Sequence, residues 1–126
     1  MAAIHQINLE TLLLKANALS PTLLYELFRT VDESISYELE IASGTGATTL
    51  PGFGSGAAQI ETIQTFVLIT DKSVTLNWNA ANTSLVVGAS QRNAVFMAYG
   101  VSTTTAPTIA NSGSTTALVQ VIAGGT

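Results

Sequence analysis

The feature that most constrains the fold is a series of short runs in which apolar and polar residues alternate, separated by glycine, proline, serine and threonine. In the clearest run, Ile35, Tyr37, Leu39 and Ile41 alternate with serine and glutamate. A period of two is typical of a half-buried β-strand. Further strands are predicted over residues 62–70, 74–79, 84–87, 94–101 and 115–122. This spacing indicates a mainly β domain, an antiparallel sandwich or barrel, and we favour a jelly-roll-like sandwich.

The run over residues 62–70 is apolar on both faces, because four apolar residues follow one another at its centre: Phe66, Val67, Leu68 and Ile69. Two stretches rich in glycine, threonine and proline are predicted as loops, residues 43–58 and 102–114. The first is long enough to reach over a partner or the sheet edge. The chain ends in Ala-Gly-Gly-Thr, which we expect to fray or to lie on a neighbour.

The first thirty-odd residues show a different period. Leucines and an alanine recur at helical spacing after a candidate cap at Asn8, and Ser20-Pro21 is a second candidate helix start. Two short helices, or one strand followed by one helix, both fit this pattern. We therefore divide the chain into a helical N-terminal segment, residues 1–33, and a β-sandwich domain, residues 34–126.

The second predicted helix presents one apolar stripe, which a short helix must cover to be stable. This stripe and the only charged residue after Ser73 form the candidate interface: Leu24, Leu27, Phe28, Val31 and Arg92. Arg92 is either a loop residue in water or an interface anchor, and we favour the anchor.

Charge is distributed unevenly along the chain. Residues 1–40 hold six acidic and two basic side chains, whereas the 54 residues from Ser73 onward hold one charge and 22 serines, threonines, asparagines and glutamines. Without a basic patch, direct binding to nucleic acid is not expected. A mean hydropathy of +0.41 with so few charges indicates that partner proteins cover much of the surface.

The sequence offers little for catalysis or for ligand binding. It has no cysteine and a single histidine, His5, so the common nucleophilic triads and zinc sites are not expected. The glycines around Ser55 match neither a phosphate-binding loop nor a nucleophile elbow. Glu61 and Asp71 lie at opposite ends of one predicted strand, roughly 30 Å apart, too far for paired carboxylate chemistry. We expect no enzyme activity, no cofactor and no metal, because Asp32, Glu33, Glu38 and Glu40 lack the spaced oxygen ligands of a calcium-binding loop.

Compartment signals are equally sparse. The N-terminus lacks the basic and apolar blocks of a secretory signal, and no run approaches ~18 apolar residues. The sequence therefore predicts a soluble chain made in the cytoplasm, without a membrane segment.

The segments ETIQTFVLITDKSVTLNWN, TSLVVGASQRNAVFMAYGV and TTALVQVIAGG together resemble the small β-sandwich structural proteins of tailed-bacteriophage virions. The resemblance covers roughly residues 60–125. It implies a capsid decoration or cement protein, or a neck or tail component, usually in homotrimers or rings, and it implies no catalytic residues.

The resulting hypothesis is a virion structural protein that binds itself, with a trimer favoured, and binds the major capsid or other virion proteins. One alternative is a neck, tail or fibre component. Another is a carbohydrate- or receptor-binding module, in which Trp78, Tyr37, Tyr99 and Phe53 would form an exposed platform. We favour a core position for Trp78, because it lies in phase with apolar neighbours.

Overall fold

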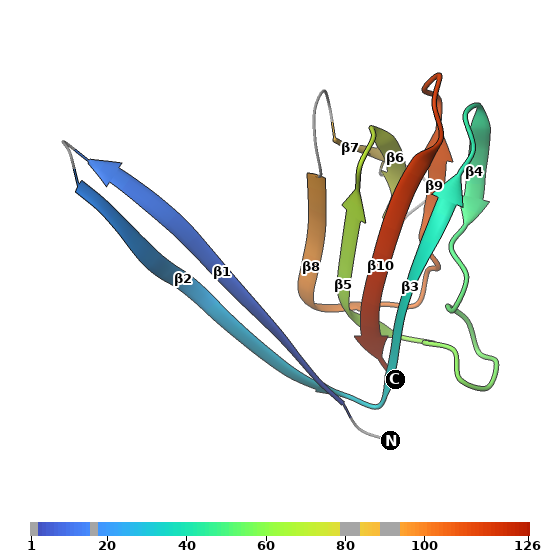
Figure 1. Ribbon diagram of the computed structural model, residues 1–126. Coiled ribbons are helices and arrows are strands. Elements are labelled where there is room, and N and C mark those ends of the chain that lie inside the picture. Colours follow the sequence, from blue (N-terminus) through green and yellow to red (C-terminus); the bar gives the residue numbers. More distant parts are fainter. Residues whose placement is uncertain (1–2, 16–17, 79–83, 89–93) are drawn as a thin grey trace.

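The computed structural model describes residues 3–15, 18–78, 84–88 and 94–126. These residues form a two-stranded hairpin followed by an eight-stranded sandwich, and the hairpin projects away from the sandwich (Figure 1). Within the described residues every regular element is a strand, and none is a helix long and apolar enough to cross a membrane.

The hairpin replaces the helical segment that the sequence predicted, so that prediction is wrong. Strand β1 (Ala3–Lys15) pairs antiparallel with β2 (Ala18–Val31), with a register irregularity after Leu9. Apolar residues at helical spacing within each segment concealed the pairing of the two segments as strands. In that pairing apolar positions lie opposite each other, as Ile7 does with Leu27. Pairing of two segments overrides the weak local preference of each. Pro21 is compatible with β2 because each strand of a two-stranded sheet has a free edge.

The sandwich consists of two four-stranded antiparallel sheets, which confirms the predicted β-sandwich. The long sheet has the order β3-β10-β5-β8 and the short sheet the order β4-β9-β6-β7. Their bounds are β3 (Glu33–Ile41), β5 (Ile63–Thr70), β8 (Ala94–Thr103) and β10 (Ala117–Gly125) in the long sheet, and β4 (Thr45–Thr49), β6 (Val74–Asn77), β7 (Ser84–Val87) and β9 (Thr108–Asn111) in the short sheet.

Strand pairing is nested along the chain. β3 pairs with β10, β4 with β9, β5 with β8 and β6 with β7, and each sheet is completed by one further pair, β5 with β10 and β6 with β9. Except for β6 and β7, sandwich strands that follow one another in sequence, such as β3 and β4 or β9 and β10, therefore belong to different sheets.

The core lies between the sheets and is filled by alternate residues of the strands. Phe66, Leu68, Leu76 and Ile109 are fully buried there. An aromatic cluster joins Phe66 to the half-buried Trp78, with ring centroids 4.9 Å apart. The predicted core position of Trp78 is thus confirmed.

The two glycine- and threonine-rich stretches are more ordered than expected. Each contains a short strand of the short sheet, β4 in the first and β9 in the second. The rest of the first stretch and the residues after it fold back on the core, where Leu50, Phe53 and Ile60 are buried. The amide of Ile60 donates to the carbonyl of Gly52 at 2.9 Å, so backbone hydrogen bonds close this loop.

The C-terminus is also fixed rather than frayed. Gly124 and Gly125 are buried in β10, between β3 and β5. A Cβ atom at Gly125 would overlap the carbonyl oxygen of Thr62, which explains the glycine. The carbonyl of Gly125 accepts a hydrogen bond of 2.9 Å from the amide of Asp32, where the hairpin joins the sandwich.

Candidate interaction surface

The outer face of the long sheet is unusually apolar for a surface. Seven residues of β5, β8 and β10 alternate there with the core residues of the same strands, and we call this set the apolar face: Val67, Ile69, Val95, Met97, Tyr99, Leu118 and Ile122. Val95 and Leu118 are 54% and 43% exposed, and the other five are half-buried.

Strand register places these residues in continuous rows across the sheet. One row runs Glu38, Gln120, Ile69, Val95. The next row runs Ser36, Ile122, Val67, Met97. Single exposed apolar residues are common on protein surfaces, but a contiguous patch marks a binding surface.

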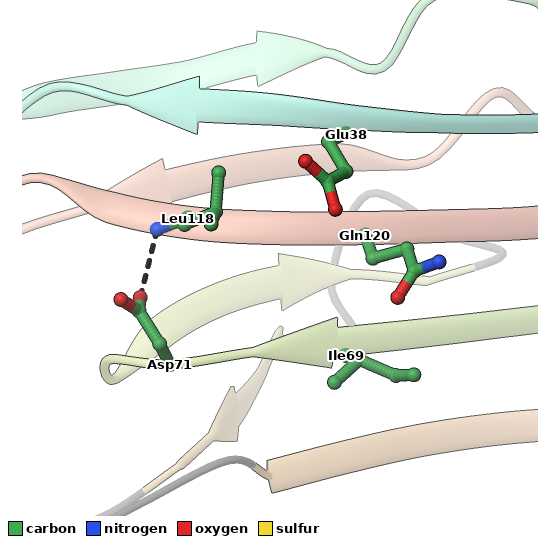
Figure 2. Close-up of a pocket in the computed structure, with 5 residues that line it drawn as sticks. All are labelled: Glu38, Ile69, Asp71, Leu118 and Gln120. Atoms are coloured by element: carbon green, nitrogen blue, oxygen red, sulfur yellow. Dashed lines mark hydrogen bonds between the residues drawn. The ribbon is translucent and has the colours of Figure 1, made fainter.

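A depression lies on this face where β3, β10 and β5 adjoin. It has a volume of about 180 Å³ and is lined by Glu38, Ile69, Asp71, Leu118 and Gln120 (Figure 2). The carboxylate of Asp71 accepts a hydrogen bond of 2.7 Å from the amide of Leu118. This bond holds the end of β5 against β10, so the rim of the depression is structurally fixed.

Tyr99 adds an unsatisfied polar atom to the apolar face. Its hydroxyl oxygen is buried and has no hydrogen-bond partner among the described residues. A buried polar group without a partner costs about 1–3 kcal/mol.

The β3 edge of the same face is polar. Ser34, Ser36, Glu38 and Glu40 are exposed and point outward, alternating with half-buried residues of the inner side. On that inner side the hydroxyl of Tyr37 donates to the carbonyl of Pro51 at 2.9 Å, and burial raises the pKa of Tyr37 to about 12. The apolar face thus has an acidic, hydroxyl-bearing border on one side.

The outer face of the short sheet has the opposite character. We call it the polar face, and its residues are Thr49, Thr75, Asn77, Val86, Thr108 and Ala110. The side-chain amide of Asn77 donates to the hydroxyl of Thr108 at 2.9 Å. Such a surface is well solvated and needs no cover.

Of the five predicted interface residues, the structure describes the side-chain surroundings of Val31 alone. Leu24, Leu27 and Phe28 lie in the strand β2 and not in the predicted helix. Val31 is buried, at 1% exposure, where β2 ends. Arg92 lies outside the described residues. A role for these five residues in binding stays a prediction.

The apolar face was not among the predicted sites, although a signal for it is present in the sequence. The unbroken run from Phe66 to Ile69 already indicates a strand with two apolar faces. Only the register shows that β8 and β10 continue the outer one of these faces.

Within the described part of the chain, no three histidine, aspartate or glutamate side chains gather in a way that would hold a metal ion. A search of known proteins finds no matching family model, no matching curated protein and no matching solved structure.

Proposed function

We propose that this protein is a structural subunit of a tailed-bacteriophage virion, a capsid decoration or cement protein that self-associates and binds the shell. The observation that carries the proposal is the apolar face, because a contiguous apolar patch on a protein surface marks a site where another protein binds. The proposed role of the protein is to hold virion subunits together and not to catalyse a reaction, and this role requires no cofactor.

The nested strand pairing supports a jelly-roll assignment. In that fold a long antiparallel ribbon rolls up, so that its first strand pairs with its last and its second with the next to last. β3 with β10, β4 with β9, β5 with β8 and β6 with β7 follow this order. Jelly rolls occur in viral capsid proteins and also in lectins and cupins, so the fold agrees with the proposal without being specific to it.

The projecting hairpin supports a role in assembly. A two-stranded hairpin is marginally stable by itself in water. Strands of 13 and 14 residues that extend away from the sandwich gain stability when they contact another subunit or the shell (Figure 1). In this proposal the hairpin is an arm for such contacts.

A carbohydrate-binding role has less support. Trp78, the best candidate for stacking on a sugar ring, packs against Phe66 and Phe96 instead. In the sandwich residues whose exposure the structure describes, the exposed large apolar side chains are all aliphatic: Leu85, Val86, Val95 and Leu118.

Immunogold electron microscopy of purified virions tests the proposal. Antibodies raised against the chain should label the head in a regular pattern. Label confined to the neck, tail or fibres would favour those alternatives, and virions without label would contradict a structural role. The purified chain should also sediment with shells that lack it.

A further inference from the structure

We infer that the apolar face is a self-association surface, and that its occupant is the same face of a second copy, related by a two-fold axis perpendicular to the strands. The inference rests on the proposed assembly function and deepens it by naming the surface and the partner.

The size of the face is sufficient for such an interface. The apolar face together with its β3 border spans four strands of 8 to 10 residues, which form a sheet surface about 19 Å wide and about 30 Å long, roughly 570 Å². Two copies packed face to face would bury about 1,100 Å² in total, above the ~1,000 Å² expected of a specific interface.

Side-chain complementarity selects the direction of the axis. With the axis between the row of Ile69 and the row of Val67, each strand lies over its own counterpart and the order of the rows is reversed. Ile69 then faces Val67 of the second copy, and Val95 faces its Met97.

The charged border fits the same arrangement. Glu38 lies opposite Ser36 of the second copy and Glu40 opposite its Ser34, so each carboxylate meets a hydroxyl donor. An axis parallel to the strands would instead place Glu38 over Val95 of the second copy. That arrangement would desolvate a carboxylate without a partner, which is unfavourable.

Native mass spectrometry and sedimentation of the full chain test the surface. Wild type should form a dimer or an even-numbered oligomer at micromolar concentration. Val67→Asp should raise the dissociation constant by ~100-fold or more. The matched control, Thr75→Asp at the centre of the polar face, should leave the dissociation constant unchanged.

A second variant keeps the test decisive if Val67→Asp fails to fold. Val95→Glu changes a side chain that is 54% exposed in the single subunit, so the fold should be preserved. It should still raise the dissociation constant by ~10-fold. An oligomer that is unaffected by both variants, or equally disrupted by Thr75→Asp, would overturn the inference.

Cross-linking tests the axis, because the chain contains no cysteine of its own. A mixture of Val67→Cys and Ile69→Cys chains should form mixed disulfides more readily than either chain alone. Preferred pairing of Ile69→Cys with Gln120→Cys would show an axis parallel to the strands and contradict this arrangement.

These outcomes separate the inference from the proposed function. A wild-type trimer that survives Val67→Asp and still sediments with shells would overturn the inference alone. A wild-type monomer that neither sediments with shells nor labels on virions would overturn both.

Discussion

Val67 in the long sheet and Thr75 in the short sheet occupy equivalent places, since each is an outward position at the centre of a four-stranded sheet. Val67 lies between Ile122 and Met97, whereas Thr75 lies between Ala110 and Val86. The same backbone arrangement thus carries an apolar face on one side of the molecule and a mainly polar one on the other. The difference is the basis of the proposal that a protein covers the long sheet while water solvates the short one.

The two sheets also differ in how their interiors are stabilised. The long sheet contributes Phe66, Leu68 and Val121, all fully buried apolar side chains. The short sheet includes a buried polar residue, Asn111, whose amide group donates to the carbonyls of Ile41 and Thr115, both at 2.9 Å. Both sheets bury apolar side chains, and Asn111 adds a buried amide that links the short sheet to β3 and to the segment before β10.

The largest expected effect is on the free energy of unfolding, and it differs between substitutions on the two faces of β5. Leu68→Ala removes a fully buried side chain and should lower the free energy of unfolding by about 2–5 kcal/mol. Ile69→Ala, one position further, should cost the isolated subunit about 1 kcal/mol, because that side chain is half-buried. Denaturant titration measures both values. Equal losses would mean that the outer face is already covered within one chain.

Asn111→Leu should have the next largest effect. The carbonyls of Ile41 and Thr115 then lose the side-chain amide of Asn111 as their donor. The amide of Gly113 loses the Asn111 side-chain oxygen, 2.9 Å away, as its acceptor. We expect a loss of about 3 kcal/mol in the free energy of unfolding. Thr108→Val is the control, because it removes a hydroxyl from the polar face of the same strand. It should lower the free energy of unfolding by about 1 kcal/mol or less. A neutral effect of Asn111→Leu would contradict the role given to hydrogen bonds.

Several of these features were predictable from the sequence and others were not. Clear alternation located β3 and β6, and the run of apolar residues located β5. β4 and β9 were missed because strands of five and four residues, rich in threonine, glycine and alanine, look like loops when read alone. Pairing with β6 in the register, not local preference, makes β9 a strand.

The hairpin and the apolar face were missed for the same physical reason. In both, apolar residues become neighbours only when distant segments pair, as Val67 does with Ile122 and Met97. A single sequence without the register does not contain that information in readable form. Helical spacing was accordingly overvalued in residues 8–31.

The pH dependence of stability probes the edge of the long sheet. Burial raises the pKa of Tyr37 to about 12, above its ordinary value of 10.0, so the neutral form is favoured in the folded state. Its contribution to stability is fully present below pH ~10 and is lost as the pH rises toward ~12. Tyr37→Phe should remove this part of the alkaline decline and cost about 1 kcal/mol at neutral pH, because the hydrogen bond to Pro51 is lost. Identical alkaline profiles for both proteins would contradict this assignment.

The smallest expected effect concerns Tyr99. Because its hydroxyl has no partner among the described residues, Tyr99→Phe should leave the unfolding free energy of the monomer unchanged or slightly raised. The dissociation constant of the oligomer should stay unchanged, because this hydroxyl is already buried within the single chain and a second copy does not reach it. A loss of monomer stability would show that the partner lies within the same chain.

The most direct test of the contrast between the two faces is thiol labelling at their centres. Val67→Cys and Thr75→Cys place one thiol on each face of a chain that has no other cysteine. As protein concentration rises through the association range, the labelling rate at position 67 should fall at least ten-fold, while the rate at position 75 should stay constant. Equal rates at the two positions at every concentration would show that the apolar face remains open to water, and would contradict the account.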